Sequence, residues 1–235
     1  MMNKPIYIGI CVLDLSKWLM YDFYYNILNQ LFPQVCLLFT DTDSLCVRIE
    51  GCDDIYKRIR EGSILLENGQ RESAMNFFDL SEYPSQHPIF NGLDEKTILD
   101  IKESNKKVPG KMKDELGGNV LLEFVGLRAK AYAFEKLVLY PNKKNTEKEG
   151  EIIEVKRLKG IQKSVVKKNI HFSHYKSSLF DKLTHTASTT SLRSHLHEIR
   201  TLCIRKVAMT PYDDKRYLLE DGICSLSYGH KILLD

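Results

Sequence analysis

The sequence predicts an α+β fold, in which an antiparallel sheet with a packed helix precedes a smaller α/β segment. Apolar residues recur at helical spacing between residues 12 and 32, and two short apolar runs with strand patterns follow this segment. After residue 123 strand alternation returns, and helical spacing follows it near the end of the chain. These observations predict the two parts of the fold.

The first predicted element is a helix with one apolar face. Positions 12, 15, 19, 23, 27 and 31, with neighbours at 13, 20 and 28, are apolar, which is the spacing of a helix about five turns long. Pro33 is expected to end the helix, because proline has no backbone N–H for a helical hydrogen bond.

The helix is followed by a predicted hairpin. Residues 35–39 are almost wholly apolar, as expected for a strand that is buried on both faces. The apolar side chains Leu45, Val47 and Ile49 alternate with more polar positions, which predicts a second strand with one covered face.

Two carboxylates, Asp41 and Asp43, flank Thr42 between these strands. Side chains alternate along an extended chain with a rise of roughly 3.3 Å per residue, so both carboxylates are expected on one side, where they can face one divalent ion. Aspartate, threonine and serine are also ordinary turn residues, so a hairpin without metal stays open as an alternative.

The middle of the chain, residues 51–105, has weak periodicity and many Gly, Pro, Asn and Ser residues. We expect an irregular surface insertion there.

From residue 123 to 139 the alternation predicts one strand, with Arg128, Lys130 and Tyr132 on a single face. Such a face can bind a phosphate backbone, although an exposed strand face with routine cations is the alternative. Residues 152–155 are expected to complete a second hairpin.

The last predicted element is a helix at residues 192–207, where apolar residues follow i, i+4, i+7 spacing. On a helix, His195 and His197 would stand about 200° apart. They are therefore not expected to share a metal ion.

Composition excludes several classes of protein. No apolar run approaches the roughly 18 residues of a membrane helix and the amino terminus has no secretory pattern, so we expect an intracellular protein without a membrane partner. The six cysteines include no CxxC pair, and we expect buried free thiols. Residues 1–100 carry 8 basic and 15 acidic side chains, and residues 101–235 carry 26 and 16. The basic part suits a polyanion, unless its lysines are only solvated.

Several segments together resemble family B DNA polymerases, most closely the protein-primed branch that includes Polinton (Maverick) elements. The run FTDTDS at residues 39–44 resembles motif C, with Phe39 and Thr40 in place of the usual tyrosine and glycine. Residues 4–26, KPIYIGICVLDLSKWLMYDFYYN, resemble the helix that precedes motif C in these polymerases. Two further segments follow in the order that the family requires, GKMKDE at residues 110–115 and FVGLRAKAY, which contains the KxY motif, at residues 124–132. KG and SVVKKNIHFSHYKSSL resemble the start of the thumb.

The resemblance implies that residues 1–160 form the carboxy-terminal half of a polymerase palm and that residues 161–235 form the thumb. It implies template-directed nucleotidyl transfer with two Mg²⁺ ions, in which Asp43 is the principal metal ligand and Asp41 supports the site. Thr42 is expected to contact the nucleotide. The residues expected to contact DNA are Lys111, Lys113, Arg128, Lys130 and Tyr132.

Two of the family's motifs are missing. Motif A, DxxSLYPS, supplies another metal aspartate, and motif B, KxxxNSxYG, supplies a lysine for the incoming nucleotide. DLSEYP at residues 79–84 is one residue too short for motif A, has Glu82 where leucine belongs, and follows motif C instead of preceding it. The chain is therefore expected to be a fragment of a longer polymerase that does not polymerise alone.

The expected partners are primer-template DNA and deoxynucleoside triphosphates, with a terminal priming protein as a further candidate. A nuclear location is expected if the chain comes from a eukaryotic mobile element. A catalytically inactive remnant that still binds duplex DNA is the alternative function. A metal-dependent nuclease is a third possibility, which requires more acidic residues near the hairpin.

Overall fold

The computed structural model describes residues 4–141, 147–212, 216–220, 225–227 and 229–233. Helices are combined there with small sheets that are antiparallel apart from one parallel pair, so the predicted α+β class is confirmed. The chain divides into two compact units, one comprising Met1–Leu121 with Lys136–Ile153 and the other Leu122–Glu135 with Glu154–Asp235. This division differs from the predicted boundary at residue 160, because the second unit includes a hairpin that precedes it.

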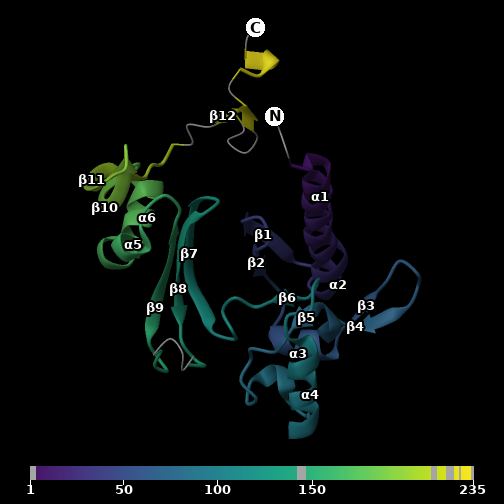
Figure 1. Ribbon diagram of the computed structural model, residues 1–235. Helices are drawn as coiled ribbons and strands as arrows, with labels where there is room; N and C mark the ends of the chain where they lie inside the picture. The colour runs from purple at the N-terminus through teal and green to yellow at the C-terminus, as the bar shows by residue number, and fades with distance from the viewer. Residues whose placement is uncertain (1–3, 142–146, 213–215, 221–224, 228, 234–235) are drawn as a thin grey trace. The chain divides into compact units, whose positions relative to one another are not determined.

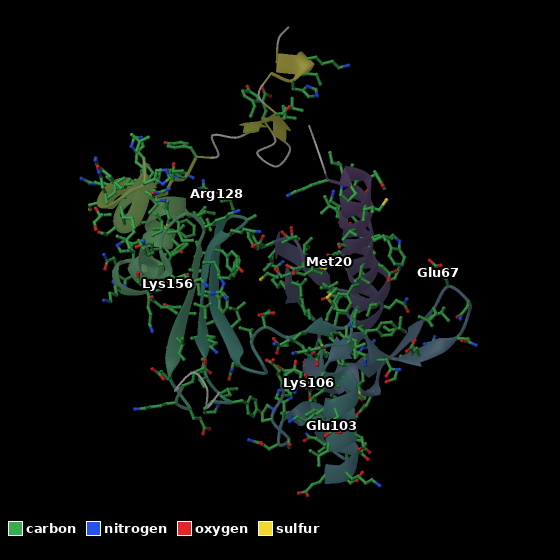
Figure 2. All side chains as sticks on the ribbon, viewed as in Figure 1. Met20, Glu67, Glu103, Lys106, Arg128 and Lys156 are labelled. Carbon is green, nitrogen blue, oxygen red and sulfur yellow. The ribbon has the colours of Figure 1, made fainter. Side chains whose placement is uncertain are left out.

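The predicted first helix is present and begins earlier than expected. It consists of α1 (Ile6–Asp22), a π-helical turn η1 (Phe23–Leu28) and α2 (Asn29–Leu31), and it ends before Pro33. Its lower half supplies the predicted apolar face from Met20 onward (Figure 2). The buried residues of this face are Met20, Phe23, Ile27, Leu28 and Leu31.

The part of α1 that precedes Met20 is not packed as predicted. Val12 and Leu15, which belong to the expected apolar face, are 59% and 66% exposed. Trp18, on another side of the helix, is 62% exposed. α1 is apolar around most of its circumference, and a helix of this kind is usually surrounded by protein or lipid.

The predicted hairpin consists of β1 (Val35–Thr40) and β2 (Leu45–Ile49), paired antiparallel (Figure 1). Leu45, Val47 and Ile49 pack against the core of the first unit, which confirms one covered face. The expectation that residues 35–39 are buried on both faces is wrong, because Leu37 is 39% and Leu38 54% exposed. The reason is that the core of the first unit covers only part of this two-stranded sheet, and Leu37 and Leu38 are not among the residues that pack against it.

The prediction of an irregular insertion at residues 51–105 is wrong. This segment contains α3 (Ile55–Glu61), β3 (Ser63–Leu65), β4 (Arg71–Ser73), η2 (Ala74–Phe77), β5 (Phe78–Asp79), η3 (Pro88–Phe90) and α4 (Glu95–Asn105). Asp54 and Asp94 cap the two α-helices by accepting hydrogen bonds from the amides of Lys57 and Thr97. The elements are too short to produce a long periodic run, so composition alone suggested loops.

The segment also supplies much of the core of the first unit. β6 (Met112–Lys113) pairs parallel with β5 and closes this part of the fold. The buried core residues are Phe23, Ile27, Leu28, Leu31, Phe32, Ile59, Ile64, Ala74, Leu80, Tyr83, Ile89, Phe90 and Ile98.

Three strands follow, with β8 (Ala131–Leu137) between β7 (Val120–Arg128) and β9 (Ile152–Leu158) (Figure 1). The expectation of one strand from 123 to 139 is wrong, because Ala129 and Lys130 form a turn. Lys130 has a φ of 62°, which reverses the chain there. β9 confirms the strand predicted at residues 152–155.

The second unit continues with α5 (Lys163–Asn169), α6 (Phe172–Phe180), β10 (His185–His195) and β11 (Glu198–Met209), followed by the short elements β12 (Arg216–Leu218), β13 (Ser225–Ser227) and η5 (Lys231–Leu233). Its core is formed by Val125, Ala131, Ala133, Leu158, Ile161, Val166, Ile170, Phe172, Tyr175, Ala187, Ala208 and Met209. The predicted helix at residues 192–207 is wrong, because β10 and β11 form a two-stranded ribbon there. Leu196 and His197 have φ values of 50° and 65°, which suit a tight hairpin turn.

The predicted burial of the cysteines is also wrong for the described residues. Cys11, Cys36 and Cys203 are exposed, and Cys46 and Cys52 are half-buried, although all five are free thiols as expected. Cys224 lies outside the described residues. No helix in the described part of the chain combines the length and apolar character that crossing a membrane requires.

Candidate metal-binding turn and basic surfaces

The tip of the β1–β2 hairpin is a tight turn from Asp41 to Ser44. The amide of Asp41 donates to the carbonyl of Ser44, and the amide of Ser44 donates back, both at 3.2 Å. The carbonyl of Asp41 also accepts from the amide of Asp43 at 2.7 Å and from the hydroxyl of Ser44 at 3.2 Å. These bonds fix the backbone that carries both aspartates.

Thr42 adopts a strained backbone conformation in this turn. Its φ is 61°, in the left-handed region that a β-branched residue rarely adopts. Strain of this kind costs on the order of 1–3 kcal/mol and is found most often at functional sites. Tight hairpin turns commonly have a positive φ at this position, where asparagine or glycine is usual, so the unusual feature of this turn is its β-branched residue.

The two carboxylates have different surroundings. Asp41 is half-buried, and its Oδ1 accepts a hydrogen bond of 3.4 Å from the hydroxyl of Thr42. Asp43 is exposed, and its carboxylate has no hydrogen bond or ion pair with the described residues. Because Thr42 is not extended, the strand alternation that predicted both side chains on one side does not apply across the turn.

The donor set of the turn suits a hard cation but is incomplete. Carboxylate oxygens are the ligands that Mg²⁺ prefers, and Mg²⁺ is commonly held by one or two carboxylates together with substrate phosphates. Within the described ranges, no group of three or more His, Cys, Asp or Glu residues is arranged to hold a metal ion. Asp43 with Asp41 could therefore supply part of a metal site.

The residues of the KxY motif lie at the β7–β8 hairpin of the second unit. Arg128 ends β7 and is exposed, as Figure 2 shows. Lys130 is exposed in the turn, and its carbonyl accepts a hydrogen bond of 2.9 Å from the amide of Lys159. Tyr132 is half-buried on β8 and stacks on Phe124, with ring centroids 5.8 Å apart. The hairpin thus presents two cations beside a fixed aromatic ring.

The other two lysines expected to contact DNA have partners within the first unit. Lys111 donates to the side-chain oxygen of Asn105 at 2.7 Å. Lys113 forms an ion pair of 2.7 Å with Glu82, and this hydrogen bond raises the pKa of the lysine. Their positive charge is therefore less available to a polyanion than that of Arg128 and Lys130.

The β10–β11 ribbon carries further cations. On the expected helix these residues would have pointed in several directions, whereas here they lie on two paired strands. Arg193 and Arg200 are cross-strand partners, and Arg205 and Lys206 lie nearer the base of the ribbon. All four are exposed, and Arg200 forms an ion pair with Glu198, the one acidic residue of the two strands. The rich content of Thr and Ser in residues 186–194 was the signal for a strand.

The histidines of the ribbon tip also differ from expectation. His195 ends β10, and His197 lies in the turn. The helical geometry used to argue that they cannot share an ion is therefore absent.

A hollow of about 790 Å³ lies at the open end of the β1–β2 hairpin, away from the Asp41–Ser44 turn. Two of the polar residues that line it have structural roles. Asp54 caps α3, and Nε of Arg58 donates to the carbonyl of Leu31 at 2.9 Å.

The GKMKDE segment contains a structural carboxylate, Asp114. It accepts hydrogen bonds from the hydroxyl of Tyr83 at 3.0 Å and from the amides of Leu116 and Gly118 at 2.8 Å. Burial and the nearby Asp114 charge raise the pKa of Tyr83, and mainly burial raises that of Tyr56 to about 12. These groups stabilise the fold of the first unit.

Comparisons with protein-family models, with curated proteins and with solved structures gave no match to this chain.

Proposed function

We propose that this chain is the carboxy-terminal palm and thumb portion of a protein-primed family B DNA polymerase, which transfers nucleotides in DNA replication. The observation that carries the proposal is the Asp41–Thr42–Asp43 turn. It combines an exposed carboxylate that has no hydrogen bond or ion pair with the described residues and a threonine with a positive φ at the tip of a hairpin. The order of the motif C, GKMKDE, KxY and thumb segments along the chain supports the same assignment.

In this proposal, Asp43 is the principal metal ligand and Asp41 supports it. A pair of Mg²⁺ ions, when bound, would stabilise the attacking 3′ oxygen and the leaving pyrophosphate. A further carboxylate must come from motif A, which the sequence lacks. Thr42 lies between the two aspartates, where it would contact the phosphates of the incoming deoxynucleoside triphosphate.

DNA would be bound by the exposed cations of the second unit. Arg128 and Lys130 at the β7–β8 hairpin are suited to phosphate contacts, and the ring of Tyr132 is suited to packing against a sugar or base. Arg193 of the ribbon extends this set, and its cross-strand partner Arg200 does so less, because it pairs with Glu198. Such contacts position a duplex without reading its sequence.

A second candidate function is that of an inactive remnant that still binds duplex DNA. The absence of motifs A and B from the sequence favours it, since the exposed cations do not depend on those motifs. A nuclease is less well supported, because the described residues place no third acidic group in a metal-binding arrangement with the pair.

The reading frame upstream of the chain distinguishes the two candidates. DxxSLYPS followed by KxxxNSxYG in that frame would identify an enzyme portion, and an intact gene without them would favour the remnant. The complete protein should then extend a primer in the presence of Mg²⁺, whereas the purified 235 residues should not. Primer extension by the 235 residues alone, or none by a complete protein that carries both motifs, would contradict the proposal.

A further inference from the structure

Three histidines meet where α6 and the β10–β11 ribbon join in the second unit. His171 precedes α6, His174 lies in its first turn, and His185 is the first residue of β10. The ring centroids of His174 and His185 are 4.9 Å apart, and those of His171 and His174 are 5.6 Å apart. No local sequence pattern indicated this group, because the histidines come from different elements.

Hydrogen bonds assign the protons of two of these rings. The backbone amide of His171 donates to Nδ1 of His174 at 2.9 Å, so this nitrogen must carry a lone pair and not a proton. The hydroxyl of Ser177 donates to the carbonyl of His174 at 3.1 Å and lies 2.9 Å from Nε2 of His185. With its hydrogen in use, Ser177 accepts from His185, which therefore donates through Nε2.

This arrangement fixes the base of the ribbon to α6. Nδ1 of His174 satisfies an amide at the start of the helix, where backbone donors have no helical partner. The carbonyl of Ser177 accepts from the amides of Asp181 and Leu183, and the hydroxyl of Ser178 donates to the carbonyl of Leu183. The residues between α6 and β10 are therefore attached to the same turns of the helix that carry the histidines.

The charged groups around His174 come from several elements. Glu154 and Lys156 of β9 form an ion pair of 3.0 Å, and Nζ of Lys156 also donates to the carbonyl of Ile170. Further along α6, Lys176 pairs with Glu123 of β7 at 2.8 Å. The pKa of His174 is lowered by burial first, then by His185, His171 and Lys156, while Glu154 opposes this shift.

We propose that His171, His174 and His185 form a proton-responsive hinge that holds the β10–β11 ribbon to α6 when the rings are neutral. A protonated His174 has N–H groups on both nitrogens, so it loses the bond from His171 and faces His185 with like charge. The base of the ribbon is then freed from α6. This hinge is independent of the function proposed above.

The direction of the pH effect follows from the lowered pKa. A histidine whose folded-state pKa lies below its unfolded value of about 6.5 contributes stability that is fully present above that pH. The contribution is lost progressively as the pH falls below about 6.5. At pH 5.5, one such group lowers the protection of the local structure by up to about tenfold.

The test is amide hydrogen exchange of the full chain at pH 7.5 and pH 5.5, corrected for intrinsic rates, for α6 and the first residues of β10. The wild type should lose up to about tenfold of its protection at pH 5.5. His174→Asn keeps an acceptor near the position of Nδ1 but does not titrate, so it should retain protection at both pH values. His195→Asn at the ribbon tip is the matched control and should behave like the wild type.

Loss of protection in His174→Asn equal to that of the wild type would overturn the proposal, as would a wild type without any pH response. If His174→Asn does not fold, ¹⁵N NMR of the wild-type histidines decides the question. Nδ1 of His174 should be unprotonated at pH 7.5 and become protonated together with the loss of protection. A proton on Nδ1 at pH 7.5 would refute the hinge.

Discussion

Arg193 and Arg200 lie directly opposite each other on the two strands of the β10–β11 ribbon. Like charges in this position destabilise a strand pair. Arg193→Glu should therefore stabilise the ribbon, by about 0.5 kcal/mol in the exchange protection of its amides.

The same change should weaken duplex DNA binding and reduce its dependence on salt. Arg193→Gln, as the control, should make the slope of log affinity against log salt shallower by about one. An unchanged DNA affinity for both variants would remove the ribbon from the DNA-binding surface.

Lys130 and Tyr132 should contribute to DNA binding in different ways. Lys130→Ala should weaken binding to all duplex sequences alike and make the salt slope shallower by about one, because each phosphate contact releases condensed counterions. Tyr132→Ala should weaken binding without changing the slope, since a ring displaces no counterion. Titrations of both variants across a salt series measure this difference. A flat slope for the wild type would mean that these cations are only solvated.

If the proposed function holds, Asp43→Asn should abolish nucleotide incorporation by the complete protein, because the amide removes the charge that the proposed metal site requires. Duplex binding should stay nearly intact, since it depends on the basic residues. Single-turnover primer extension measures the first effect and a binding titration the second. Asp53→Asn, at another exposed aspartate of the first unit, is the control and should retain activity. Activity of Asp43→Asn above about a tenth of the wild type would refute the role of this residue.

Two adjacent glycines allow a matched test of packing in the first unit. Gly118 and Gly117 have φ values of 85° and 61°, so alanine is strained at both. A Cβ at Gly118 would also lie 2.6 Å from Nε2 of His87, whereas a Cβ at Gly117 would meet nothing within 4 Å. Gly118→Ala should therefore cost about 1–3 kcal/mol more than Gly117→Ala in urea unfolding. Equal costs would show that the loop moves freely away from His87.

His87 should make the first unit sensitive to acid. It is 1% exposed, its Nε2 is buried without a hydrogen-bond partner in the described part of the chain, and its ring stacks on Tyr83. Burial lowers the pKa of His87 to about 4, against a smaller opposing effect of Asp114. Because the folded state favours the neutral ring, the stabilisation is complete above about pH 6.5 and decreases as the pH falls toward 4.

The loss attributable to His87 should reach about 3 kcal/mol at pH 4. His87→Asn keeps an acceptor for the amide of Ile89 but binds no proton, so its free energy of unfolding should depend less on pH. Urea unfolding between pH 7.5 and 4.5 measures both slopes. Equal slopes for variant and wild type would assign the acid sensitivity to other groups.

Local patterns predicted the elements whose neighbours in sequence decide their structure. The long helix followed from its apolar spacing and from Pro33, and the β1–β2 hairpin followed from alternation around the Asp41–Ser44 run. The candidate site residues Asp41 and Asp43 could be located at the tip for the same reason. The different burial of the two aspartates and the positive φ of Thr42 could not, because both depend on the turn geometry.

Elsewhere the predictions failed where periodicity was ambiguous or short. Apolar residues at 192, 196, 199 and 203 fit helical spacing, but the tight turn at Leu196 and His197 divides the segment into two strands. The turn at Lys130 divides another segment in the same way. In residues 51–105, pairing between short segments that are distant in sequence builds the core, and no local pattern records such pairing.

The exposed apolar surface of α1 makes the measured stability of this protein a property of the solution as well as of the chain. Any molecule that binds this surface in the native state alone raises the apparent free energy of unfolding by RT ln(1 + [L]/Kd). Binding of a second copy of the chain there would make the melting temperature rise with protein concentration, and binding of a buffer component would make it depend on the buffer. Melting temperatures of samples that contain α1 can be compared only when they are measured at the same protein concentration and in the same buffer.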